Sequence, residues 1–140
     1  MRQSAVAPRQ SVDSATGGSA TIRSYRDLRV WNEAMDLAEA ACRTASQLPK
    51  SEMYGFTAQI RRAAASVPAN IAESYGRESR GAYVQFLRVA QGSIKELETH
   101  VMLANRIDLL NREAIDPIMA RCDTVGRMLR GLIRSLDGEA

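Results

Sequence analysis

The chain is poor in aromatic residues, which make up 5% of its 140 residues, and it contains one histidine and two cysteines. So few aromatics beside many Ala, Leu, Arg and Glu residues favour helices packed through aliphatic side chains over a β-sheet. The two cysteines are far apart and form no metal or redox motif, so we expect free thiols and a reducing, cytoplasmic environment.

The sequence also lacks the long apolar segments that membranes require. No apolar run approaches about 18 residues, and the first residues do not form a charged-then-apolar leader with a small-residue cleavage site. We therefore expect neither a membrane span nor a secretory signal. The hydrophobic content of 45% is enough for one core, and the length suits one domain.

Constellations typical of enzymes are missing too. His100 is the single histidine, so a histidine-based acid and base pair would need a partner such as Glu96, four residues earlier. The carboxylate and histidine spacing of di-iron bundles is absent, as is a nucleophile elbow. We expect His100 to be a solvated surface residue and Cys42 and Cys122 to lie in the core. The sequence favours a binding or scaffold protein that needs no metal and no cofactor.

The net charge of +3 is modest but unevenly distributed. Residues 1–23 carry three arginines and one acid and almost no large apolar side chains, so we expect a disordered, slightly basic tail. Residues 61–95 hold six bases and two acids, a local charge of +4. This excess is typical of a surface that meets an acidic or phosphate-bearing partner. The arginines in it that we assign to nucleic-acid binding are Arg61, Arg62, Arg77, Arg80 and Arg88.

Helical periodicity divides residues 24–140 into four expected helices. Asp27 is predicted to cap the first, which ends before Pro49 and carries two apolar stripes, with Trp31 as a main anchor of the core. Ser51 with Glu52 is predicted to start the second helix, which continues to about residue 77 or 78. The first stripe of the first helix comprises Leu28, Trp31, Met35, Ala38, Cys42 and Ala45, and the second comprises Val30, Ala34, Leu37, Ala41 and Leu48.

The last two helices carry heptad seams. Ser79 is predicted to open the third, and Gly92 within it to allow close helix contact. The fourth has two possible starts: Asp116 as the cap with Pro117 in the first turn, or a helix from Arg112 that continues through Pro117. The seams are Tyr83, Leu87, Ala90, Ile94, Leu97, Val101 and Ala104, and then Ile115, Ile118, Cys122, Val125, Leu129, Leu132 and Leu136. Four helices with short connections predict an all-α, antiparallel up-down-up-down four-helix bundle.

The second helix is unusual because three stripes follow it, at about 100° per residue. One stripe is apolar and faces the expected core. A small-residue stripe, either plain surface or an oligomer interface, consists of Ala58, Ala65, Ala69, Ala72 and Gly76. A polar strip, either a self-contained surface network or a ligand site, combines Arg62 and Arg77 with Ser66, Asn70 and Glu73. Pro68 lies between them and leaves the carbonyl of Ala64 without its helical donor, which predicts a kink or a free carbonyl; back-bonding by Ser66 would partly repair the ladder.

Several of these segments together resemble a known family. They are Leu28 to Trp31, Tyr54 to Thr57, Arg61 to Ala64, Ser66 to Glu73 with Gly76 and Arg77, and Gly92 to Glu98. The chain from about Tyr25 to Leu136 resembles the four-helix bundle proteins encoded in intervening sequences of bacterial 23S ribosomal RNA genes. Ser74 departs from the glycine expected before an aromatic residue.

The resemblance implies a homopentameric ring of bundles with no established enzymatic activity. The family is similar in fold to the accessory proteins of diversity-generating retroelements, which are pentameric and basic and work with a reverse transcriptase and its RNA. We therefore expect a homo-oligomer as the first partner, and structured RNA or an RNA-processing protein as the second. The alternatives are a protein-only scaffold and, as the least favoured, an enzyme built around Glu73 with His100 or a cysteine.

Overall fold

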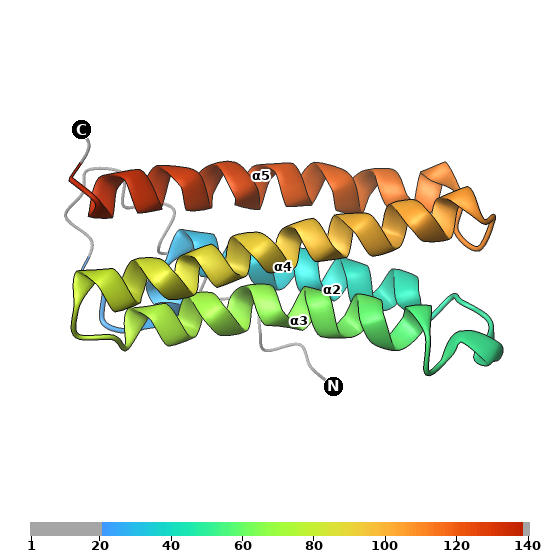
Figure 1. The fold of residues 1–140 in the computed structure, drawn as a ribbon, viewed down its shortest axis with the longest axis horizontal. Coiled ribbons are helices and arrows are strands. Elements are labelled where there is room, and N and C mark those ends of the chain that lie inside the picture. The colour runs from blue at the N-terminus through green and yellow to red at the C-terminus, as the bar shows by residue number, and fades with distance from the viewer. Residues whose placement is uncertain (1–20, 139–140) are drawn as a thin grey trace.

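The computed structural model describes residues 21–138, so most of the predicted tail, residues 1–20, lies outside the described residues. Four long helices pack together without any strand in that range: α2 (Arg29–Ala45), α3 (Phe56–Tyr75), α4 (Arg80–Arg106) and α5 (Arg112–Leu136). Helix α3 contacts α2 and α4, and α5 contacts the same two helices. Short connections make successive helices run in opposite directions (Figure 1). The all-α, four-helix prediction is confirmed.

The core contains most of the heptad seams of α4 and α5 and mainly one of the two α2 stripes. The seam residues Tyr83, Leu132 and Leu136 are only half-buried. Ala34, Leu37 and Ala41 of the second α2 stripe are fully buried, whereas Trp31 is half-buried and Met35 is exposed. Trp31 packs against the core without being enclosed by it, so the prediction of Trp31 as a main anchor of the core is only partly correct. Both stripes are apolar, and a helix at the corner of a four-helix arrangement turns only one side toward the centre.

Two predicted helix starts are wrong. Asp27 does not cap α2; its carboxylate accepts from the backbone N–H of Arg23 and Ser24 and belongs to the capping box of a 3-10 turn, η2 (Tyr25–Asp27). Ser51 and Glu52 form a second turn, η3 (Lys50–Glu52), and α3 begins later, at Phe56. Capping residues satisfy free N–H groups at the start of any helical turn, so they do not distinguish a 3-10 turn from an α-helix.

The other boundaries follow local capping chemistry. The Ser79 hydroxyl accepts from the N–H of Ala82, as predicted for the start of α4. Asn111 accepts from the N–H of Ala114, which settles the start of α5 at Arg112 and places Pro117 inside the helix. Helix α3 likewise continues through Pro68 and ends at Tyr75, slightly before the predicted end.

Candidate oligomer and nucleic-acid interfaces

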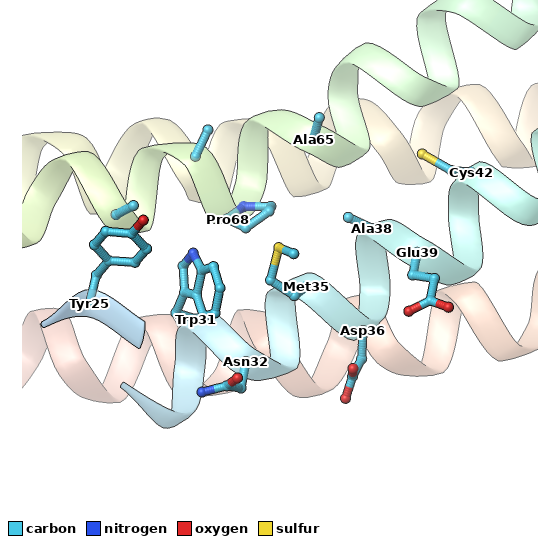
Figure 2. A pocket seen from close by; sticks show the side chains of 12 residues that line it. Tyr25, Trp31, Asn32, Met35, Asp36, Ala38, Glu39, Cys42, Ala65 and Pro68 are labelled. Atoms are coloured by element: carbon cyan, nitrogen blue, oxygen red, sulfur yellow. The ribbon is translucent and has the colours of Figure 1, made fainter. Parts of the chain in front are cut away.

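A groove of about 670 Å³ lies between α2 and α3, and it is largely apolar. Figure 2 shows Trp31 and Met35 of α2 pointing toward Pro68 of α3. Trp31 packs edge-on against Tyr25, with ring centroids 5.2 Å apart, and Met35 is 42% exposed. The α3 side of the groove is made by Ala65, Pro68, Ala69 and Ala72. The α2 stripe that the core leaves out and the small-residue stripe of α3 thus form one surface, which we call the α2/α3 groove.

The small-residue stripe is only partly used in this groove. Ala65, Ala69 and Ala72 line it, whereas Ala58 is half-buried outside it and Gly76 is exposed at the end of α3. Cys42 also lines the groove, so the prediction that this thiol lies in the core is wrong. The small alanine side chains leave the floor of the groove open to a partner that could approach the α3 backbone closely.

The middle of the polar strip joins α3 to α4. The hydroxyls of Ser66 and Ser93 are 2.7 Å apart and share a hydrogen bond. The side-chain amide of Asn70 donates to the Ser66 hydroxyl at 2.9 Å and to the Ser66 carbonyl at 2.8 Å. The Ser66 hydroxyl therefore reaches across the helix interface, and the predicted back-bond to its own helix does not form. This part of the strip is a structural network.

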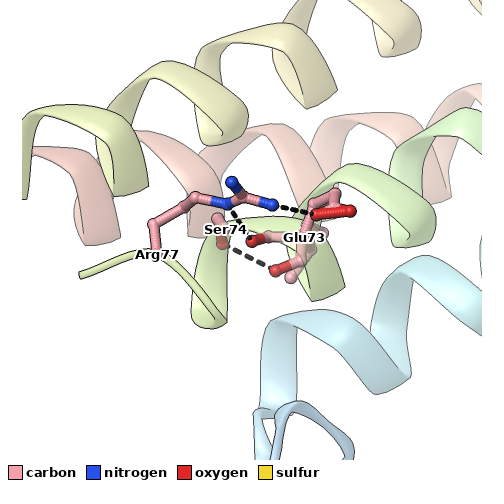
Figure 3. A network of polar contacts seen from close by, with 4 residues as sticks. Glu73, Ser74 and Arg77 are labelled. Carbon is pink, nitrogen blue, oxygen red and sulfur yellow. Dashed lines mark hydrogen bonds and ion pairs between the residues drawn. The ribbon is translucent and has the colours of Figure 1, made fainter. Parts of the chain in front are cut away.

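The end of the polar strip is an ion pair on the surface where α3 ends. Arg77, just beyond α3, donates to the Glu73 carboxylate at 2.7 Å (Figure 3). The Arg77 guanidinium also lies over the ring of Phe86, 4.8 Å from its centroid. Both side chains are about half exposed, so the pair stabilises the fold little. Beside it, the buried hydroxyl of Ser74 donates to the Ile71 carbonyl at 2.6 Å. A serine at this position is thus accommodated inside the core.

The five arginines assigned to nucleic-acid binding do not form one patch. Arg61 and Arg62 lie near the start of α3, and Arg77 and Arg80 flank its other end, about 20 Å away along the helix. Arg88 faces α5 and pairs with Asp137 at 3.7 Å. Within residues 21–138, Arg61, Arg62 and Arg80 are exposed and make no ion pair. Of the five assigned arginines, these three are the ones that the fold leaves available.

The residues considered for catalysis are not brought together. Glu73 binds Arg77 near the end of α3, whereas His100 lies late in α4, toward the opposite end of the antiparallel pair. His100 is half-buried, and its Nε2 atom has no hydrogen-bond partner, so its prediction as a solvated residue is wrong. No group of three potential metal ligands occurs among residues 21–138.

A second groove, which the sequence did not predict, separates α4 from α5. It measures about 430 Å³ and has Arg88, Lys95 and Glu98 on the α4 side and Cys122, Asp123 and Arg130 on the α5 side. Gly92 and Gly126 line it as well, and a side chain at Gly92 would meet nothing within 4 Å. The prediction that Gly92 allows close helix contact is wrong, since it opens space instead. We call this space the α4/α5 groove.

The two thiols should differ sharply in reactivity. Burial, with a smaller contribution from nearby Glu98, raises the pKa of the Cys122 thiol to about 12, whereas Cys42 is accessible in the α2/α3 groove. Only the thiolate is alkylated, so in a single folded subunit at pH 8, with the α2/α3 groove open, we expect iodoacetamide to modify Cys42 and to leave Cys122 unmodified until the protein unfolds. Peptide mass mapping of the folded monomer measures this. Equal labelling of both sites would contradict the buried position of Cys122.

Raising the pH should also destabilise the fold through Cys122. The thiol loses its proton near pH 9 in the unfolded chain but only near pH 12 in the folded one, so its contribution to stability is complete below pH 9 and is lost as the pH rises toward 12. Between pH 8 and pH 10.5, the free energy of unfolding measured with urea should fall less for Cys122→Ala than for the unchanged protein. An identical loss in both would contradict the raised pKa.

The helices and their packing define an all-α protein built from four helices, and no helix in residues 21–138 is long and apolar enough to cross a membrane. The sequence pattern of the family described as 23S rRNA-intervening sequence protein matches residues 26–131, and the chain belongs to this family. No curated protein matches it.

A solved structure supports the fold. It is a protein of unknown function from the S23 ribosomal protein family of Bacteroides thetaiotaomicron, which matches with a TM-score of 0.70 and 23% identity. The match covers 75% of this chain and 98% of the other. At this identity the likeness concerns the fold alone.

Proposed function

We propose that the protein is a non-enzymatic, homo-oligomeric helical-bundle protein that binds structured RNA through arginines repeated around the assembly. The observation that supports the proposed assembly is the α2/α3 groove. It joins two stripes that the core of one bundle does not bury, and it is mainly apolar, as the surfaces between identical subunits commonly are. A second copy of the chain is the occupant that we assign to it.

The resemblance to the family implies a pentamer, and a contact between two different surfaces, repeated around a ring, closes such an assembly. Repetition matters for RNA binding because the charge of one subunit is small. Several copies of a weak site on one rigid ring raise the effective concentration at the second contact and strengthen binding without any new interaction. The arginines that each subunit would contribute are Arg61, Arg62 and Arg80, which have no ion-pair partner among residues 21–138.

RNA binding should depend steeply on salt. Each phosphate contact releases counterions, so the affinity for a fluorescently labelled RNA hairpin should fall at least about tenfold between about 50 and 200 mM salt. Changing Arg61, Arg62 and Arg80 together to Ala should weaken binding further at 50 mM and reduce the salt slope. Fluorescence anisotropy measures both quantities.

The matched control is Arg43→Ala with Arg112→Ala and Arg127→Ala, because these three arginines are exposed but paired with carboxylates of their own helices. It removes the same charge and should retain more of the binding. No binding at low salt would reject the RNA function and favour a scaffold with a polypeptide partner. An equal loss in both triple variants would reject the three assigned arginines.

A further inference from the structure

The α4/α5 groove has the size and polarity of a small-molecule site. Its volume of about 430 Å³ lies in the range of ligand pockets. Ile94 and Cys122 provide an apolar floor, and both are almost fully buried. The pKa of the Cys122 thiol is raised to about 12, so the thiol is protonated and uncharged at neutral pH and suits a binding surface better than a nucleophile.

Missing side chains create this space. Gly92 and Gly126 line the groove on the two helices; a Cβ atom added at Gly92 would meet nothing within 4 Å, and one at Gly126 would meet only the end of the Arg130 side chain, at 3.7 Å. Alanine would therefore fit at both positions and would favour the helix more than glycine does. Packing does not require these glycines, and their effect is to leave the groove open.

Two arginines meet at one end of the groove. Because α4 and α5 are antiparallel, the early α4 residue Arg88 lies at the same end as the late α5 residue Arg130. Arg88 is held only by Asp137, at 3.7 Å, and Arg130 makes no ion pair within the described part of the chain. Two guanidiniums that are not fully neutralised suit a phosphate group, whose oxygens match their fork of N–H donors.

The other end of the groove holds two carboxylates, each with a cation beside it. The Glu98 side chain is 18% exposed and has Lys95 at 3.5 Å as its ion-pair partner, and Asp123 on the facing helix pairs with Arg127. A carboxylate only accepts hydrogen bonds and has about four acceptor sites, so Glu98 can still accept from a ligand edge that donates. The amino groups of guanine, adenine and cytosine donate, whereas the corresponding positions of uracil are carbonyl acceptors.

We propose that the α4/α5 groove binds a nucleoside monophosphate whose base carries an amino group, with the phosphate between Arg88 and Arg130 and the base edge at Glu98. The base would lie over Ile94 and Cys122 in the space that Gly92 and Gly126 leave. The same chemistry is present in a free nucleotide and in a nucleotide within single-stranded RNA. In the second case the inference deepens the proposed RNA binding, but the free nucleotide tests it independently.

Guanosine 5′-monophosphate is the probe, measured by isothermal titration calorimetry on the full chain and compared with uridine 5′-monophosphate and inorganic phosphate. We expect uridine monophosphate to bind about tenfold more weakly, because uracil offers Glu98 a single N–H donor between two carbonyls, whereas guanine offers two adjacent donors. Inorganic phosphate should be weaker still. Equal binding of the two nucleotides would overturn the role of Glu98, and no binding of guanosine monophosphate at millimolar concentration would overturn the site.

Gly126→Leu fills the groove and should abolish nucleotide binding while the melting temperature stays the same or rises. Gly131→Leu is the matched control, because Gly131 is in the same helix, does not line the groove and has nothing within 4 Å of an added Cβ. Arg130→Gln should weaken the binding of both guanosine monophosphate and inorganic phosphate. Nucleotide binding that survives Gly126→Leu would place the ligand elsewhere and reject the proposal.

Two short RNAs test whether the groove binds a free nucleotide or a nucleotide within single-stranded RNA. If the groove holds a nucleotide of RNA, a five-nucleotide RNA with one central guanine among uracils should bind more tightly than the all-uracil RNA, and Gly126→Leu should remove the difference. If only free guanosine monophosphate binds, the groove is a metabolite site. The triple change of Arg61, Arg62 and Arg80, which tests the proposed RNA surface, should leave guanosine monophosphate binding intact, so the two proposals can fail separately.

Discussion

Replacing Ala69 by Arg is expected to convert the assembled protein to a monomer of 15.4 kDa. Ala69 is exposed on α3 and lines the α2/α3 groove beside Ala65 and Ala72. In the proposed assembly an arginine there would place a long charged side chain inside a mainly apolar contact and leave it without a partner, and every interface of the ring would carry the change. Light scattering coupled to size exclusion at micromolar concentration measures the loss of mass.

The fold should survive this change, because Ala69 is exposed in the single chain and arginine favours helix nearly as well as alanine. Circular dichroism should show the same helical content. Ala120→Arg is the matched control: Ala120 is also exposed and helical, but it lies on α5 and lines neither groove. Two results would reject the α2/α3 groove as the interface: an unchanged protein that is already monomeric, or an Ala69→Arg variant that keeps its full mass.

The helical pattern predicted which helices form but not how each is turned in the fold. In α2 both apolar stripes satisfy the same periodicity, and only the positions of α3 and α5 decide that Leu37 is buried and Trp31 borders a groove. The large area of Trp31 predicts a core anchor, yet the half-buried residue packs against the core from outside, with its ring edge-on to Tyr25. An aromatic residue on a second apolar stripe is therefore a signal for a groove as much as for a core.

The predicted heptad seam of α5 matches the buried residues near the start of the helix but not near its end. Ile115, Ile118 and Cys122 are buried as predicted, but near the end of the helix Ile133 is buried while Leu132 is only half-buried. A straight α-helix has 3.6 residues per turn, so a seam with a period of 3.5 rotates by about 20° per heptad. After several turns the next residue takes the core position.

The two grooves show which parts of the candidate sites could be read from the sequence. The small-residue stripe of α3 was visible because its members recur along one helix. The α4/α5 groove was not, because Arg88, Glu98 and Arg130 come from two helices, and their register depends on how those helices pack. The one local signal was Gly92, which is compatible both with close contact and with open space.

We expect Leu97→Ala to destabilise the fold strongly. Leu97 is on the heptad seam of α4 and is fully buried, with 0% of its surface exposed. Truncating such a side chain removes apolar burial and leaves a cavity that its neighbours fill only partly, which typically costs about 2–5 kcal/mol. Urea unfolding followed by circular dichroism measures this loss of stability: the midpoint should fall to a lower urea concentration, while the dependence of the free energy of unfolding on urea stays unchanged.

Leu103→Ala is the matched control for this prediction. It makes the same chemical change in the same helix, but Leu103 is 46% exposed, so the expected loss is below about 1 kcal/mol. Both measurements belong in the Ala69→Arg background if that variant is monomeric, because subunit association otherwise adds a concentration-dependent term to the apparent stability. Similar losses for Leu97→Ala and Leu103→Ala in the monomer would mean that the α4 seam does not face the core, and a larger loss for Leu103→Ala only in the assembled protein would place Leu103 in a subunit contact.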